Sequence, residues 1–321
     1  MRTILFLLIV SIALYSSLSF SESKKYPSRP IRLIVANGPG SSPDVIARII
    51  NGKLSELLGQ PVIVDNRPGA TGLIAVELLA KSTPDGHTLF LSTMTQLISM
   101  IMYQKYLLAS ELSPVTLVGT TPFAIVINAS IPVRTIPEWI AYARPRQNQI
   151  NYGSGGLWGS SHLCIEAFNS LTGLKITHIP YPSTGATVAD LISGNIQMYC
   201  PAAPSLPAIN NSGKLRVLGV TYLKPTKLVP GIPPISDSVP GFELLGWYGI
   251  NVALHTPPDI ISKLNLSFNK VLKNIDVQER MFAVGTDAIG STPEWFSKFL
   301  RKDTDHWTKI LNESGASIRK E

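Results

Sequence analysis

The stretch Ile31-Arg32-Leu33-Ile34-Val35-Ala36-Asn37-Gly38-Pro39-Gly40-Ser41-Ser42-Pro43-Asp44 decides the fold of this chain. Its first six residues form a short apolar run, which predicts a buried β-strand, and the Asn, Gly, Pro and Ser residues after it predict a tight loop. A helix is expected next. Pro43 is typical of a first helical turn, Ser42 is expected to cap the helix, and Asp44 is a negative charge where the helix dipole favours one.

A second strand follows this helix. Apolar residues from Val45 to Leu57 recur at helical spacing, Gly59 is placed to end the helix, and the run 61–64 is apolar and strand-like. The whole is one β-loop-α-β unit. In such a unit the free N–H groups of the helix start lie at the carboxyl edge of a parallel sheet, where they can receive an anion.

The same arrangement returns in the second half of the chain. A strand is expected at 150–152, a glycine-serine loop at 153–161, and a helix that ends near Gly173. Strands and helices alternate elsewhere, which predicts an α/β fold. We expect two lobes with a cleft between them, one made of residues 26–123 plus 250–321 and the other of residues 124–249.

Two closing helices are expected at the end of the chain. One begins after Pro257-Pro258, and the other begins at the capping box Ser291-Thr292-Pro293-Glu294. Residues 92–95, which follow a predicted strand at 88–91, are rich in hydroxyl groups. They are expected at the carboxyl end of that strand, where open α/β sheets bind ligands.

The N-terminus has the layout of a secretory signal peptide. Arg2 precedes an apolar run at 4–14, and small residues follow it, so residues 1–21 are expected to be removed on export to the periplasm. An uncleaved anchor is the alternative. No later stretch approaches the roughly 18 apolar residues of a membrane span.

Charge and cysteine content limit the classes of function that the chain can have. The formal charge of +7 is scattered among Lys and Arg residues, which argues against nucleic-acid binding. The chain has two cysteines, Cys164 and Cys200. In an oxidising compartment they are permitted to form a disulfide, and two buried free thiols are equally compatible with the sequence.

Many blocks of the chain, in one order, resemble the Bug-type periplasmic receptors of tripartite tricarboxylate transporters. These blocks are 26–31, 40–44, 58–62, 66–70, 84–89, 160–163, 178–181, 213–216, Pro257 and 291–294. The resemblance implies a two-lobe fold, a periplasmic-binding-protein fold of type II, that closes on a ligand without catalysis. It also implies a small carboxylate as ligand (a di- or tricarboxylate, an acidic amino acid or a related organic acid) and a membrane permease as partner. No cofactor or metal is expected, and the receptor is expected to be a monomer.

The resemblance places ligand contacts in four loops, 37–44, 92–95, 153–161 and 183–187, and Trp247 is added as an aromatic residue that lines the cleft. The predicted binding residues are Asn37, Gly38, Gly40, Ser41, Ser42, Ser92, Thr93, Thr95, Ser154, Gly155, Ser160, Ser161, Ser183, Thr184, Gly185, Ala186, Thr187 and Trp247. The chain departs from the family pattern in the first loop. It also has Cys200-Pro201 where many relatives have phenylalanine-aspartate, so a contact from that aspartate is missing.

The predicted loops contain no Arg or Lys, so we expect backbone N–H groups and hydroxyls to hold the carboxylates. Ser42 and Ser161 are expected either to cap their helices or to contact the ligand. A diacid that binds one lobe at each end would favour the closed state, because only a ligand that bridges the cleft contacts both lobes at once.

Three alternatives compete with this interpretation. Gly38-x-Gly40 after a strand, with Asp65 at the end of the next strand, is compatible with a dinucleotide-binding enzyme, although Pro43 replaces the third glycine. A hydrolase using Ser160, Ser161 and His162 is disfavoured, because neighbours on one helix start do not face one another. A receptor that presents its ligand to a sensor would keep the same fold.

Overall fold

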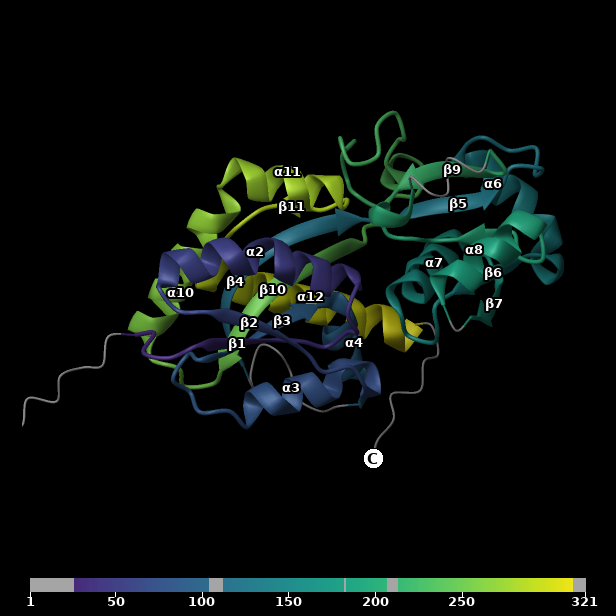
Figure 1. Cartoon of the computed structure of the whole chain (residues 1–321). Coiled ribbons are helices and arrows are strands. Elements are labelled where there is room, and N and C mark those ends of the chain that lie inside the picture. The colour runs from purple at the N-terminus through teal and green to yellow at the C-terminus, as the bar shows by residue number, and fades with distance from the viewer. Residues whose placement is uncertain (1–25, 104–111, 182, 207–212, 314–321) are drawn as a thin grey trace, which may run out of the picture.

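The computed structural model describes residues 26–103, 112–181, 183–206 and 213–313. These residues form two β-sheets that lie side by side, each covered by helices on both faces (Figure 1). The predicted signal peptide lies outside the described residues. Among the helices that are described, none combines the length and the apolar character that a membrane crossing requires.

The first sheet has the strand order β11-β4-β10-β3-β1-β2. Strands β1, β2 and β3 are parallel, whereas β10 runs antiparallel to both of its neighbours, β3 and β4. The strands are β1 (Ile31–Val35), β2 (Val62–Asn66), β3 (Thr88–Thr93), β4 (Leu112–Pro122), β10 (Leu245–Ala253) and β11 (Asp287–Ala288).

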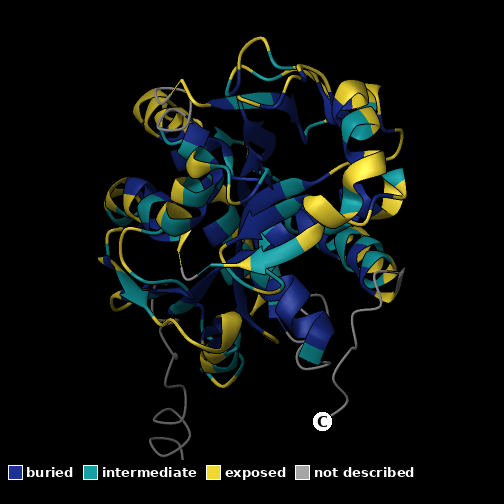
Figure 2. Cartoon of the chain, turned by 90° about the vertical axis from the view of Figure 1, so that its right-hand side faces the viewer, coloured by how far each residue is buried: buried dark blue, intermediate teal, exposed yellow. Residues whose placement is uncertain are grey.

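Described helices cover both faces of this sheet (Figure 1). One face carries α2 (Ser42–Leu58), α10 (Pro258–Leu272) and α11 (Ile275–Ala283), and the other carries α3 (Leu73–Ala80), α4 (Met94–Tyr103) and α12 (Pro293–Glu313). Strand alternation divides the core accordingly, because Leu33 and Val35 pack with the first group and Ile34 with the second. In Figure 2 the inner strands are buried, an edge strand is partly exposed, and the outer surfaces of the helices are exposed.

The second sheet has the order β7-β6-β8-β5-β9. Its elements are β5 (Ala124–Asn128), α6 (Ile136–Ala143), β6 (Asn151–Ser154), α7 (Ser160–Thr172), β7 (Thr177–Pro180), α8 (Thr184–Ser193), β8 (Met198–Tyr199) and β9 (Leu215–Val220). The unit β6-α7-β7 repeats the unit β1-α2-β2, and in both sheets the first strand of the unit lies between two parallel partners. The repeat expected from the two glycine-serine loops is therefore present.

The chain crosses between the sheets twice, and Thr221 ties the crossings together. Phe123, between β4 and β5, donates its N–H to the Thr221 hydroxyl at 2.9 Å, and Thr221 N–H donates to the Phe123 carbonyl at 3.0 Å. Strand β10 pairs with β4 from Leu245 onward, five residues before the predicted boundary at 250. The division into lobes by residue number stays a prediction.

Two predicted helix starts shift by one residue. Ser41 is the N-cap of α2 and Ser42 its first residue, because the extended backbone ends one residue earlier than expected. Thr292 rather than Ser291 caps α12, since the Trp295 N–H donates to the Thr292 hydroxyl at 3.2 Å. Gly59 ends α2 in the left-handed conformation, as predicted.

Three helices, not two, close the chain, since α11 stands between the two that were expected. The second correction concerns residues 92–95. They do not form a loop, because β3 runs to Thr93 and α4 begins at the next residue.

The two cysteines form a disulfide, which settles the alternative left open by the sequence. Cys164 lies in α7 and Cys200 directly follows β8, with 6.3 Å between their Cα atoms. Both side chains are fully buried. The bond therefore ties α7 to the strand end that leads into residues 201–205.

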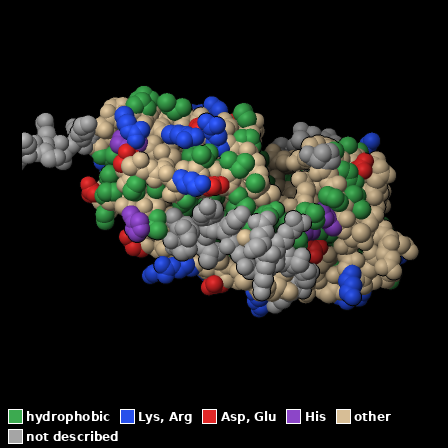
Figure 3. All heavy atoms as spheres, turned by 90° about the horizontal axis from the view of Figure 1, so that it is seen from below, with side chains coloured by type: hydrophobic (Ala, Val, Ile, Leu, Met, Phe, Trp, Pro, Cys, Tyr) green, Lys and Arg blue, Asp and Glu red, His purple; other side chains and the backbone are tan. Residues whose placement is uncertain are grey.

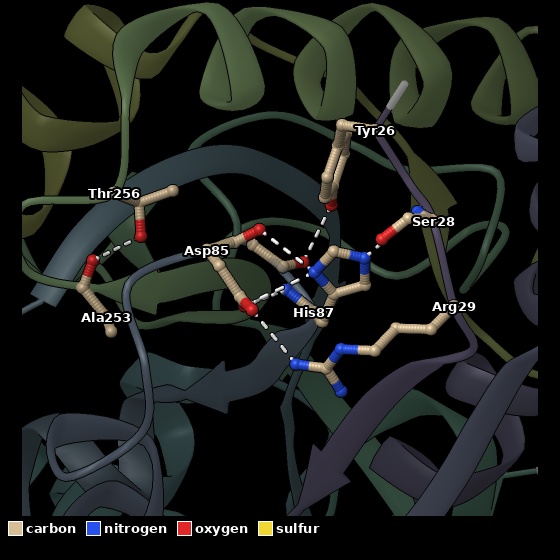
Figure 4. Close-up of polar contacts among 8 residues, drawn as sticks. Tyr26, Ser28, Arg29, Asp85, His87, Ala253 and Thr256 are labelled. Carbon is tan, nitrogen blue, oxygen red and sulfur yellow. Dashed lines mark hydrogen bonds and ion pairs between the residues drawn. The ribbon is translucent and has the colours of Figure 1, made fainter. Parts of the chain in front are cut away.

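The first described residues are fastened to the loop that leads into β3 (Figure 4). The Tyr26 hydroxyl donates to the Gly86 carbonyl at 2.7 Å, and Arg29 pairs with Asp85 at 2.9 Å. The Ser28 N–H donates to His87 Nε2 at 3.2 Å. This bond requires His87 to carry its proton on Nδ1, which lies 3.1 Å from the Asp85 carbonyl.

Candidate functional site

A cavity of about 390 Å³ opens between the two sheets. Seen from below, the molecule consists of two masses with a notch between them (Figure 3). The cavity is lined by residues of both sheets and of the two crossings, namely Asn37, Ser41, Ser42, Pro43, Thr93, Met94, Thr95, Thr121, Phe123, Gly155, Gly159, Ser160, Ser161, Thr184, Tyr199, Ala202, Gly246, Trp247 and Tyr248.

Among the described helices, four begin at this cavity, two from each half of the molecule. The first residues of α2 and α4 line it from the first sheet, and those of α7 and α8 line it from the second. Each helix start carries unsatisfied N–H groups and a positive partial charge. Four converging starts make the cavity electropositive without any charged side chain.

The starts of α2 and α7 are the most available to a ligand. No side chain caps either helix, and the N-cap residues are Ser41 and Gly159. The buried Ser41 hydroxyl has no hydrogen-bond partner. By contrast, the Ser183 hydroxyl already accepts the Ala186 N–H at the start of α8. An oxygen-bearing anion would satisfy the open donors of α2 and α7 together.

None of the described residues that line the cavity is charged. Asp44, in the first turn of α2, does not line it. Its carboxylate accepts hydrogen bonds from the Gly40 N–H at 2.9 Å and from Asn66 Nδ2 at 3.0 Å, and it pairs with Arg48 at 3.0 Å. Hydrogen bonding from Arg48 lowers the pKa of Asp44. The negative charge is thereby compensated away from the cavity.

Two neighbouring histidines, whose rings are tilted by 38°, hold the loop that leads into α7. His178 Nε2 lies 2.7 Å from the buried Ser154 hydroxyl, and the Trp158 N–H donates to His162 Nδ1 at 3.2 Å. The two imidazole rings are 4.2 Å apart. Trp158 has a positive φ of 61°, an uncommon conformation for a large residue, and the bond to His162 helps to hold it.

Acid should loosen this loop. Burial lowers the pKa of His162 from its ordinary 6.5 to about 4, so the folded protein binds this proton more weakly than the unfolded chain does. The resulting stability is complete above pH 6.5 and is lost as the pH falls toward 4. We expect a loss of about 2 to 3 kcal/mol from His162 over this range, measured by urea unfolding at each pH.

His162→Asn is the matched variant, because Asn Oδ1 can replace the Nδ1 acceptor and does not titrate. His178 belongs to the same cluster, and because burial lowers its pKa as well, it titrates over this range in both proteins. The variant should therefore retain part of the acid sensitivity. An unfolding free energy that falls equally in the variant and the wild type between pH 6.5 and 4 would contradict the role given to His162.

Ten of the eighteen predicted binding residues line the cavity: Asn37, Ser41, Ser42, Thr93, Thr95, Gly155, Ser160, Ser161, Thr184 and Trp247. They come from all four predicted loops and from β10. The structure thus brings together residues up to 210 positions apart (247 − 37) in the sequence. Their contact with a ligand stays a prediction.

The other eight predicted residues do not line the cavity, and internal contacts explain four of them. Ser92 is buried and donates to Asn251 Oδ1 at 2.6 Å, and Ser154 bonds to His178. The Ser183 hydroxyl caps α8, and the buried Thr187 hydroxyl donates to the Ser183 carbonyl at 3.0 Å. Gly38, Gly40, Gly185 and Ala186 also lie outside the lining.

Sequence reasoning missed several lining residues. Thr121 and Phe123 lie where β4 passes into β5, and Gly246 and Tyr248 flank Trp247 on β10. These four residues could have been predicted from the two expected chain crossings. A chain that passes from one sheet to the other must run along the cleft between them. Tyr199 and Ala202 were also missed, whereas Pro43, Met94 and Gly159 lie within predicted loops but were not named as binding residues.

The dinucleotide alternative finds no support in the positions of its key residues. Neither Gly38 nor Gly40 lines the cavity. Asp65 is engaged by Arg32 at 2.5 Å and by Arg67 at 3.0 Å. A carboxylate held by two arginines is not available to a ribose hydroxyl.

A sequence profile of the tripartite tricarboxylate transporter family receptor matches residues 46–316. The chain is 32% identical to the protein BugT of Bordetella pertussis over 299 residues, which is 92% of each chain. Among solved structures, it is similar to the R. palustris protein Rpa4515 with adipate, with 28% identity, a TM-score of 0.78, and coverage of 90% of this chain and 98% of that one.

A second solved structure gives the same picture. The periplasmic binding protein BugD superposes with a TM-score of 0.77 and 26% identity, covering 91% of this chain and 99% of that one. Both neighbours span nearly the whole described fold. The two-sheet architecture is therefore that of the two-lobe periplasmic binding proteins.

Proposed function

This chain belongs to the family of receptors of the tripartite tricarboxylate transporters, and on that premise we propose that it captures a small carboxylate outside the cytoplasm and delivers it unaltered to a membrane permease. The receptors of this family bind solutes and are not enzymes. The proposal adds the ligand class, the periplasmic location and the delivery step for this particular chain.

The observation that carries the proposal is the convergence of four helix starts on one cavity without charged lining residues. Carboxylates are held at helix starts by charge-assisted hydrogen bonds, each contributing on the order of 1.5 to 3 kcal/mol. Two starts come from each half, so a diacid has a receptor for each end. The neighbour Rpa4515 with adipate supports a diacid.

The apolar part of the cavity suits a carbon skeleton. Phe123, Ala202 and Trp247 lie in the lining together with the hydroxyl-bearing residues. A chain of methylene groups buried against them gains about 0.8 kcal/mol per group. The lining therefore favours an acid with a short hydrocarbon chain over a compact inorganic anion.

Export is supported by two features of the chain. The N-terminal segment has the composition of a signal peptide. The disulfide between Cys164 and Cys200 is the form expected in an oxidising compartment such as the periplasm.

A thermal-shift panel tests the ligand class. The panel contains adipate, malate, citrate, aspartate, benzoate, NAD and the neutral diamide adipamide. An acid present at one hundred times its dissociation constant should add about 2.7 kcal/mol of stability, or about 4 °C for a chain of this size. A response to NAD or adipamide without a response to any acid would refute the proposal.

Closure is tested separately by small-angle X-ray scattering. We expect the radius of gyration to fall when a binding diacid is added, because the ligand bridges the two halves. A monoacid of the same chain length engages one half and should compact the protein less. Unchanged scattering at saturating acid would refute closure but would leave the ligand class standing.

A further inference from the structure

Trp247 connects the cavity to the C-terminal helix α12. It lies on β10 between the cavity residues Gly246 and Tyr248, and it lines the cavity itself. Its ring is only 1% exposed and meets Phe296 and Phe299 of α12 edge to face, each with a centroid distance of 5.9 Å. The position of this wall of the cavity therefore depends on α12.

The packing between β10 and α12 is close. A Cβ atom added at Gly249 would lie 2.0 Å from the Phe296 ring. Helix α12 also contacts α4, whose first residues line the cavity, and α7 of the second half. A change in a side chain of α12 can therefore alter the packing where the two halves meet.

The polar end of Trp247 has one specific partner in this helix. Its Nε1–H donates to Asp303 Oδ2 at 2.8 Å, and the Trp307 indole is a second hydrogen-bond partner of the same carboxylate. Among the described residues, no Lys or Arg forms an ion pair with Asp303. Two neutral indoles are therefore its principal partners.

A carboxylate in this position is costly if its role is only to fill space. Asp303 is half-buried, and the partial loss of hydration of a carboxylate without a paired cation is unfavourable, whereas an apolar side chain of similar size would pack beside the aromatic rings at lower cost. What a carboxylate supplies is a directed acceptor for two N–H groups. It fixes the rotation of each indole, which an apolar residue cannot do.

We propose that Asp303 is a positioning residue that holds the Trp247 indole in place as a wall of the ligand cavity. The inference rests on the proposed function, since the position of Trp247 affects affinity only if an acid binds in the cavity. With its N–H engaged by Asp303, the indole is held in one rotation at the edge of the cavity. Asp303 thereby sets the width of the space available to the carbon skeleton of the ligand.

The surroundings of Asp303 make this contact sensitive to pH. Burial raises the pKa of Asp303 to about 6, and hydrogen bonds from Trp247 and Trp307 partly oppose that rise. Glu243 raises the pKa further and Lys302 lowers it, and His306 and Lys309 complete the charged groups nearby. The NMR signal of the Trp247 indole N–H should therefore shift as Asp303 binds a proton near pH 6.

Indole N–H NMR of the full mature chain tests the proposal directly. The chain has five tryptophans, and Trp247→Phe and Trp307→Phe assign the two resonances of interest. Asp303→Leu removes both acceptor oxygens, and Asp303→Asn keeps one acceptor and abolishes the titration. Asp305→Asn, an exposed carboxylate on the same helix, is the matched control.

In Asp303→Leu we expect the Trp247 indole proton to exchange with solvent about ten-fold faster and the affinity for adipate to fall about ten-fold. In Asp303→Asn the resonance should stay near its wild-type position but lose its shift around pH 6. Asp305→Asn should match the wild type in every measurement. If Asp303→Leu does not fold, the titration in Asp303→Asn decides.

Two results would overturn the inference. One is a folded Asp303→Leu variant with unchanged Trp247 exchange and affinity, and the other is a pH shift of Trp247 that persists in Asp303→Asn. A failure of the proposed function would give a different set of results. If adipate does not bind the wild type, the exchange and titration measurements still decide whether Asp303 positions Trp247.

Discussion

Ser161→Glu is expected to lower the affinity for the bound acid about one hundred-fold. Ser161 lies in the first turn of α7 and lines the cavity. A carboxylate placed about 5 Å from a bound carboxylate costs roughly 3 kcal/mol at an effective dielectric constant near 20. Calorimetric titration with the acid that gives the largest thermal shift measures the loss.

The same substitution should leave the fold intact, because a negative charge in the first turn of a helix interacts favourably with the helix dipole. This separates loss of binding from loss of stability. Ser161→Gln is the matched control, since it adds the same bulk without the charge. Equal affinities of the Glu and Gln variants would show that no anion sits at the start of α7.

The second large effect is expected from removing the disulfide. The bond between Cys164 and Cys200 closes a loop with a sequence separation of 36 residues, for which the loss of chain entropy in the unfolded state corresponds to roughly 4 kcal/mol. The double variant Cys164→Ala, Cys200→Ala should lose stability of this order in urea unfolding. Its stability should no longer respond to a reducing agent, whereas that of the wild type should.

Ligand binding should also weaken in the double variant. Cys200 precedes Ala202, which lines the cavity, and Cys164 lies one turn from the start of α7. Without the disulfide, the segment around Ala202 and the start of α7, which both line the cavity, are held less firmly. A wild-type protein with two titratable thiols and unchanged stability under reduction would rule out the disulfide as a stabilising element.

Local sequence was sufficient to predict the repeated β-loop-α-β units. Pro43 and Gly59 mark the ends of α2, and the apolar residues between them have helical spacing. The error in the cap came from a serine doublet, since Ser41 and Ser42 offer the same hydroxyl. Only the backbone conformation distinguishes which of them precedes the first helical residue.

Elements without a boundary signal were harder to predict. Strand β3 passes directly into α4 with no loop residue between Thr93 and Met94, so the hydroxyl-rich junction resembled a turn. Helix α11 did carry a signal, because Asn274 caps it by accepting the Val277 N–H at 3.4 Å. A short amphipathic segment between two longer helices was nevertheless overlooked.

The direction of side chains limited the prediction of the site. Ser92 and Thr93 are neighbours on β3, yet only Thr93 lines the cavity, because successive side chains of a strand point to opposite faces. Ser92 instead points toward Asn251 on β10. The register between β3 and β10, which places these two residues together, cannot be read from either strand alone.

The central claim is that the cavity recognises negative charge through helix starts instead of charged side chains. Calorimetric comparison of the acid that gives the largest thermal shift with its neutral amide counterpart tests this most directly, since the two share shape and carbon skeleton. We predict that the amide binds about one hundred-fold more weakly. Equal affinity of the acid and the amide would contradict the claim.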